Sequence, residues 1–85
     1  MNDALVLLEQ LGALGLLLRT GRSAEACADL PAVMEALAQC MAGRPPALQE
    51  AFALQMAHAL QAWERHDWLG LADSLDVDLP AALQA

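Results

Sequence analysis

The chain of 85 residues has no lysine and no tyrosine, and it has hardly any valine, isoleucine or threonine. Because the β-branched and aromatic residues that favour strands are so scarce, while alanine and leucine are abundant, the composition predicts a fold built from helices alone. With four arginines and 11 acidic residues, the formal net charge is -7. Most nucleic-acid affinity comes from cations that neutralise phosphates, so we expect no binding to nucleic acid.

Cysteine is also scarce, since Cys27 and Cys40 are the only two. Both fall at apolar helical positions, and a disulfide scaffold normally has more cysteines in a loop-rich chain. We therefore interpret them as reduced thiols, which points to a cytoplasmic protein. The leucine-rich stretch 4–18 is too short for a membrane span and contains Glu9 and Gln10, so we expect neither a signal peptide nor membrane insertion.

Motifs for catalysis and for cofactors are missing as well. The sequence has no glycine-rich phosphate loop, no GxSxG and no paired-carboxylate signature. His58, His66 and the two cysteines lack the short paired spacing that fixes two metal ligands on one turn. His66 and Asp67 are adjacent, but neighbouring residues in a turn do not converge on one point. We therefore expect a protein that is not an enzyme, with no catalytic residues, no cofactor and no metal.

Apolar residues, by contrast, make up 58% of the sequence, which exceeds the roughly 45–50% usual for soluble domains. The stretch 47–75 contains both tryptophans and the only phenylalanine. Its apolar residues recur at helical spacing, stop at the polar residues 64–67 and then resume, which is typical of two antiparallel helices joined by a tight turn. The ridge consists of Leu48, Phe52, Met56, Ala59, Leu60 and Trp63, and after the turn of Trp68, Leu71, Ala72 and Leu75.

The preceding part of the chain, about residues 2–42, has the pattern of another helical hairpin. Its first helix is expected to end near Arg19, with Gly21 as the stop, and Ser23 is a suitable N-cap for the next helix. One ridge of the first helix is formed by Leu7, Leu11, Leu14 and Leu18.

The later hairpin is expected over about residues 46–85, with Pro46 near its start and Asp67 as the cap of its second helix. Pro31 and Pro80 fall within helical patterns. Since an interior proline removes a hydrogen bond and crowds the preceding turn, we expect a kink or a break at each. The predicted fold is all-α: a single-domain small bundle of four main helices, built as two antiparallel helical hairpins.

The chain has more apolar surface than one small core can hide, which favours a partner that covers it. On the first helix, Leu5, Leu8 and Leu16 lie off the main ridge. Trp63 and Trp68 flank the hairpin turn, where they either pack against each other or anchor an interface, because tryptophan is enriched among binding hot spots. These five are the candidate partner-binding residues, and the expected partner is another protein or a second copy of the chain.

The segment Ala62–Leu75 has the sequence AWERHDWLGLADSL, in which an alanine and a short polar turn are followed by Asp-Trp and a leucine-rich helix. This pattern resembles that of small flagellar export chaperones of the FliT type. The resemblance implies a cytoplasmic all-helical protein that binds a short segment of an export substrate and prevents its premature assembly. The segment Asp67–Leu79 also resembles the C-terminal part of small bacterial helical proteins to which no activity is assigned.

Three hypotheses for the function follow. The first is a non-enzymatic adaptor or secretion-type chaperone that offers an apolar groove to an amphipathic helix of its client. The second is a structural homodimer in which the first helix pairs across a two-fold axis. The third is a helical domain that binds a small molecule or a metal.

Overall fold

The computed structural model describes residues 3–84, which form four helical rods and contain no strand. The first three rods are α1 (Asp3–Arg19), α2 (Ser23–Met41) and α3 (Pro46–Glu64). The fourth rod consists of α4 (Trp68–Asp73), the π-helical turn η1 (Ser74–Asp78) and α5 (Leu79–Gln84), which follow one another without a gap. The prediction of an all-α bundle with four main helices is confirmed.

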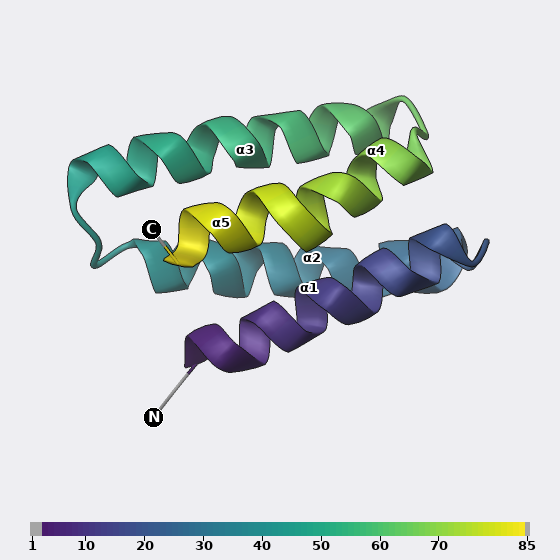
Figure 1. Ribbon diagram of the computed structural model, residues 1–85, viewed down its shortest axis with the longest axis horizontal. Coiled ribbons are helices and arrows are strands. Elements are labelled where there is room, and N and C mark those ends of the chain that lie inside the picture. Colours follow the sequence, from purple (N-terminus) through teal and green to yellow (C-terminus); the bar gives the residue numbers. More distant parts are fainter. Residues whose placement is uncertain (1–2, 85) are drawn as a thin grey trace.

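Successive rods run in opposite directions, so that the chain forms two antiparallel hairpins (Figure 1). The α1–α2 and α3–α4 turns lie at one end of the bundle, and the α2–α3 connection lies at the other. The fourth rod packs against both α1 and α3, and α1 also packs along α2. Because α2 and α3 touch each other much less, one edge of the bundle is only loosely closed.

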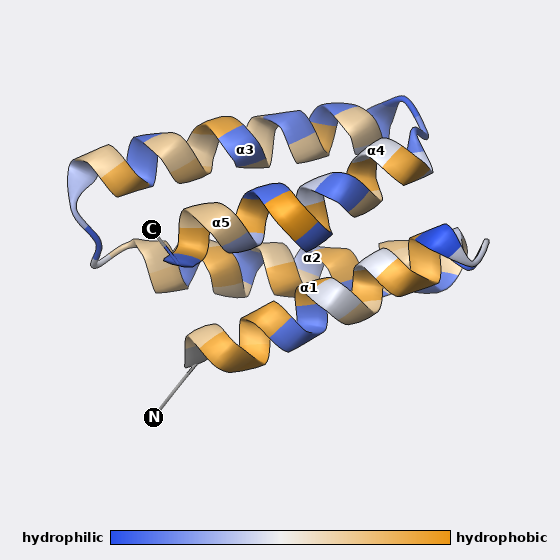
Figure 2. Ribbon diagram, viewed as in Figure 1, coloured by the Kyte–Doolittle hydropathy of each residue, from blue (hydrophilic) through white to orange (hydrophobic). Residues whose placement is uncertain are grey.

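Leucines from α1 and from the fourth rod form the middle of the core. The ridge predicted for α1 is confirmed, since each of its four leucines is at most 5% exposed. By comparison, α3 contributes only two fully buried apolar residues. Figure 2 shows apolar residues in both halves of α1, with a hydrophilic patch near its middle. The two leucine sets are Leu7, Leu11, Leu14 and Leu18 on α1, and Leu71, Leu75, Leu79 and Leu83 on the fourth rod.

The buried leucines of the fourth rod are spaced four residues apart, which a regular α-helix cannot keep on one side. Each step of four residues turns the side chain by about 40° beyond a full turn, so Leu83 would point about 120° away from Leu71. The π-turn takes an extra residue into one turn, as the hydrogen bond from Leu79 N to Ser74 O shows. This turn brings the leucines back to the core side, where all four are buried.

The two interior prolines differ in their effect on the helices. At Pro31, α2 continues as a single helix, so the chain does not break there into two helices. At Pro80, the π-turn ends at Asp78 and α5 begins one residue before the proline. The helix therefore changes its geometry next to the point where the proline ring would crowd the preceding turn.

The turn after α1 is closed by two backbone hydrogen bonds. Gly21 N donates to Leu18 O over 3.4 Å, and Arg22 N donates to Leu17 O over 2.8 Å. Gly21 has a φ of 80°, in the left-handed region that glycine enters without a steric penalty. The prediction that Ser23 caps α2 is wrong: Arg22 holds the N-cap position without a side-chain cap, and Ser23 is already helical because the turn ends one residue earlier.

The turn after α3 has the same hydrogen-bond pattern. His66 N donates to Trp63 O over 3.0 Å, and Asp67 N donates to Ala62 O over 2.9 Å. Here the left-handed position is taken by His66, with a φ of 57°. The predicted cap is confirmed, because Asp67 Oδ1 accepts a hydrogen bond of 3.0 Å from Gly70 N in the first turn of α4.

We predict that Gly21→Ala lowers the free energy of unfolding by about 1 kcal/mol, because alanine resists the left-handed backbone. A Cβ at Gly21 would meet no atom within 4 Å, so the backbone alone is responsible. Gly12→Ala is the matched control. Its position is equally open but lies within the span of the helix α1. Since alanine is favoured over glycine in a helix, the change should raise the free energy of unfolding by about 0.5–1 kcal/mol. Urea denaturation followed by circular dichroism measures both, and a stabilised Gly21→Ala would contradict the turn conformation.

Candidate functional site

The three candidate leucines on α1 differ in exposure. Leu5 and Leu16 are 55% and 62% exposed, whereas Leu8 is half-buried against the core. Leu5, Gly12 and Leu16 lie on one side of α1 by their helical spacing, and we call this side the outer strip of α1. Other large apolar residues are also exposed: Val6, Leu54, Leu60, Leu69 and Val77.

Trp63 and Trp68 are both half-buried and pack against the core. The stacked aromatic pair in the described part of the chain is His66–Trp68, with ring centroids 5.1 Å apart and planes at 14°, and not a pair of tryptophans. His66 reaches Trp68 from the left-handed turn position. Trp63 instead lines a hollow together with Leu60, Glu64 and His66.

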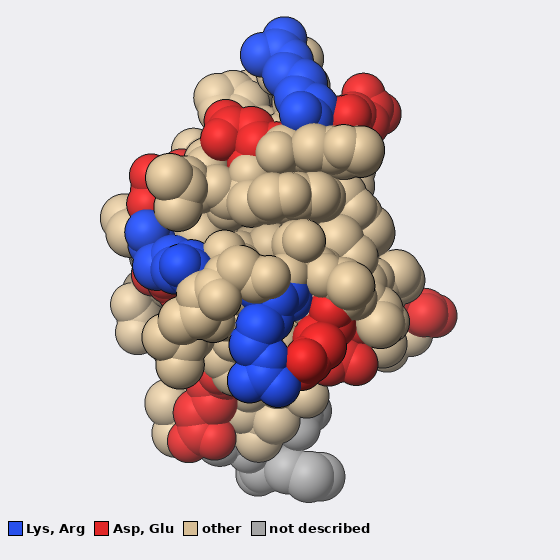
Figure 3. All heavy atoms as spheres, turned by 90° about the vertical axis from the view of Figure 1, so that its right-hand side faces the viewer, with Lys and Arg blue, Asp and Glu red and all other residues tan. Residues whose placement is uncertain are grey.

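The side chain of Arg19 connects α1 to the fourth rod. Its Nη2 lies 2.8 Å from Asp73 Oδ1, and its Nε lies 3.1 Å from Asp76 Oδ2. The hydrogen bonds to Asp73 and then to Asp76 raise the pKa of this guanidinium above its ordinary value, because both carboxylates favour its charged form. Gly15, one turn earlier, makes room for the carboxylate, because a Cβ there would overlap Asp76. Figure 3 shows this end of the bundle, where arginines and acidic side chains lie next to one another and form no basic face.

An apolar groove of about 390 Å³ lies between α2 and α3, which are neighbours in the bundle but touch each other little. Alanines spaced four residues apart lie in both walls: Ala38 on α2 and Ala42 just after its end, and Ala53 and Ala57 on α3. Because α1 holds α2 and the fourth rod holds α3, these short side chains leave space between the helices. We call this space the α2–α3 groove, and the rest of its lining is Met41, Gln49, Phe52, Met56 and Leu60.

Gln49 is the only polar residue in the lining of the groove, and the nitrogen of its amide is already engaged. Its Nε2 donates to Ala42 O over 3.0 Å and to Arg44 O over 2.8 Å. These carbonyls lie just after α2, where a helix end leaves such groups without intrahelical partners. The amide nitrogen therefore ties the start of α3 to the end of α2, and both of its hydrogen bonds go to the chain's own backbone.

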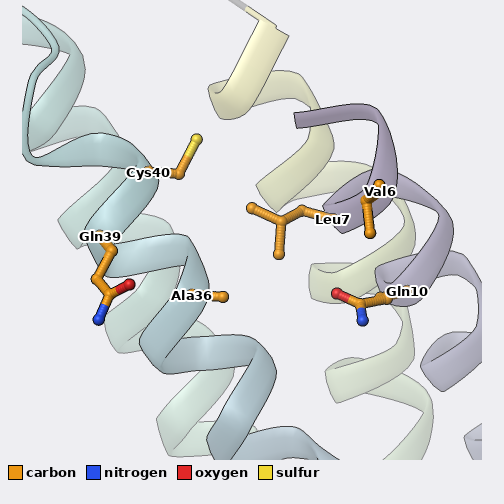
Figure 4. A pocket seen from close by; sticks show the side chains of 6 residues that line it. All are labelled: Val6, Leu7, Gln10, Ala36, Gln39 and Cys40. Carbon is orange, nitrogen blue, oxygen red and sulfur yellow. The ribbon is translucent and has the colours of Figure 1, made fainter. Parts of the chain in front are cut away.

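A second hollow, of about 470 Å³, lies between α1 and α2 (Figure 4). Leu7 and Cys40 point into it from opposite sides, and Gln10 and Gln39 add two amides to its lining. Both cysteines, Cys40 and Cys27, are free thiols. Among the residues that the structure describes, no three histidine, cysteine or acidic side chains are grouped so that they could hold a metal ion.

Sequence reasoning singled out Leu60 and Phe52 as ridge residues, but it missed the groove that they help to line. The available signal was the pair of alanines spaced four residues apart on each of the two helices. In a chain so rich in alanine, pairs with this spacing are common, and which of them face an open edge depends on the packing of distant helices.

Comparisons with protein-family models, with curated proteins and with solved structures found no match for this chain. Within residues 3–84, no helix is long and apolar enough to cross a membrane. A function for the chain therefore rests on its own geometry and chemistry.

We predict that Gln49→Met lowers the free energy of unfolding by about 1–2 kcal/mol. Methionine keeps the length of the side chain but removes both donors, and each lost hydrogen bond contributes about 0.5–1.5 kcal/mol. Gln61→Met, at an exposed position of the same helix, should change stability by less than about 0.5 kcal/mol. Thermal denaturation compares the two variants, and equal effects would contradict the role assigned to the Gln49 amide.

Proposed function

We propose that the protein is a small helical protein-interaction module that binds an amphipathic helix of a partner protein in the α2–α3 groove. The observation that carries this proposal is the groove itself. It is open, it is lined by apolar side chains from two helices, and its single amide is bonded to the backbone of the chain.

A helix suits this groove better than a small molecule does. Sites for small molecules usually combine an apolar cavity with a few polar groups that orient the ligand. The α2–α3 groove has a single such group, the amide of Gln49, and the nitrogen of this amide is already bonded to backbone carbonyls. A helix needs no such groups because its backbone hydrogen bonds are made internally, and its leucines would cover Leu60, which is 43% exposed.

The proposal includes no catalytic activity and no cofactor. The one adjacent His–Asp pair supports this, because both residues have structural contacts at the α3–α4 turn. His66 stacks on Trp68, and Asp67 accepts the amide proton of Gly70.

In its narrower form, the proposal is a cytoplasmic secretion or flagellar export chaperone, and the bound helix is part of an export substrate. The resemblance of Ala62–Leu75 to chaperones of the FliT type supports this form. The free thiols of Cys27 and Cys40 suit a reducing compartment.

A structural homodimer is the second candidate, and the outer strip of α1 favours it. Leu5 and Leu16 are exposed, and a Cβ at Gly12 between them would meet no atom within 4 Å, so a second helix has room to approach.

Analytical ultracentrifugation distinguishes the homodimer from the interaction module. A dimer that Leu16→Glu dissociates would support pairing through α1, whereas a monomer at tens of micromolar would remove this candidate.

We predict that Ala53→Glu weakens the binding of an amphipathic helical peptide at least about tenfold, because it places a charge in the apolar groove. The probe is a fluorescent peptide of about 18 residues, five turns of helix, with leucines on one side and glutamines beside them. Fluorescence anisotropy measures its affinity, and circular dichroism verifies that each variant is folded.

Ala51→Glu is the matched control for Ala53→Glu. Ala51 is also an exposed alanine of α3, but it lies on the opposite side of the helix, so its replacement should leave the affinity unchanged. Equal weakening by both changes, or a wild-type protein that does not bind the peptide, would argue against the groove as the binding site.

A further inference from the structure

We infer that the partner helix has lysine or arginine residues on both sides of its apolar stripe. This inference rests on the proposed function, since it concerns the same α2–α3 groove and adds the chemistry of the occupant. It follows from the charged side chains that border the groove on each of its two walls.

On the α3 wall, the groove is bordered by Glu50 and Glu64. Glu50 precedes Ala53 by three residues and Ala57 by seven, so it lies on the same side of the helix as these two. Glu64 follows Leu60 by four residues. Glu64 and Leu60 line the hollow that also contains Trp63, and Leu60 lines the groove as well, so this hollow lies next to the groove. The two glutamates are exposed to solvent.

On the α2 wall, Glu35 takes the corresponding position. It precedes Ala38 by three residues and Ala42 by seven, and it is exposed. The ion pairs found within the described part of the chain involve other carboxylates. Glu35, Glu50 and Glu64 are therefore available to pair with cations of a bound helix.

The arginines nearest to the groove lie towards its ends. Arg44 is half-buried in the loop after α2, and Arg65 follows Glu64 at the end of α3. Neither lies along the two walls, which are bordered by carboxylates in a chain with a net charge of -7. A helix in the groove therefore meets a negative border on both sides.

The same charges argue against a second copy of the chain as the occupant. The exposed outer strip of α1 has Glu9 beside it, and Arg19 at its end is already held by two aspartates. A second copy would bring like charges together, which opposes association. Lysine and arginine beside an apolar stripe would instead pair with the glutamates, and their methylene stems would cover the apolar walls.

Three peptides with the same leucine stripe and lysine, glutamine or glutamate beside it test this inference. At low ionic strength we expect the lysine peptide to bind at least about fivefold more tightly than the glutamine peptide, and the glutamate peptide to bind most weakly. At about 1 M salt the three affinities should converge, because exposed charges are screened.

Matched charge variants separate the effect of the glutamates that border the groove from the effect of the chain's net charge. Glu35→Gln combined with Glu50→Gln should reduce the preference for lysine to less than about half, and should leave the affinity for the glutamine peptide unchanged. Glu9→Gln combined with Asp29→Asn removes the same charge on other faces and should keep most of the preference.

The outcomes distinguish this inference from the proposed function. If the three peptides bind the groove equally well, or if both double variants lose the preference equally, the inference is wrong and the proposed function stands. A preference for the glutamate peptide would also overturn the inference. If no peptide binds, both are wrong.

Discussion

The contact of the fourth rod with both α1 and α3 is the interaction on which the rest of the structure depends. Its buried leucines meet the leucine ridge of α1 on one side and the ridge of α3 on the other, and thereby join the two hairpins. The π-turn at Ser74–Asp78 is part of this arrangement, because it keeps the buried leucines of the fourth rod, which are spaced four residues apart, on the core side. Arg19 strengthens the same contact at its solvent-exposed edge through Asp73 and Asp76.

This arrangement has a consequence for the opposite edge of the bundle. Since the fourth rod holds α3 and α1 holds α2, the fold does not require close packing between α2 and α3. The alanines on both helices leave an apolar groove there, and Gln49 fixes only the end nearest the loop. Apolar surface left open in this way is typical of interaction sites, and the glutamates beside it give the site a charge preference.

Much of the fold could be predicted from nearby residues, because helix ridges and caps depend on local spacing. The leucine ridge of α1 and the cap at Asp67 are examples. The prolines show the limit of such prediction. The same Asp-Leu-Pro-Ala sequence surrounds Pro31 and Pro80, yet α2 continues through the first, while a π-turn precedes the second. The two helices differ in the spacing of their buried apolar residues, which recur at steps of three and four on α2, whereas the buried leucines of the fourth rod recur at steps of four only. The contacts of Arg19 join residues 54 and 57 positions apart, and the groove depends on which edge stays open, so neither follows from a local pattern.

Site-specific photo-crosslinking in the native cell tests most directly whether another protein covers the α2–α3 groove. A photoreactive phenylalanine analogue is placed at one of three positions. At Ala53 it lies in the groove, and at Ala51 it lies on the opposite side of α3. At Leu16 it lies on the outer strip of α1. We expect a discrete product with a different polypeptide from the Ala53 site and none from the Ala51 site. No product from the Ala53 site, or a product between two copies of the chain from the Leu16 site alone, would contradict the assignment of the groove.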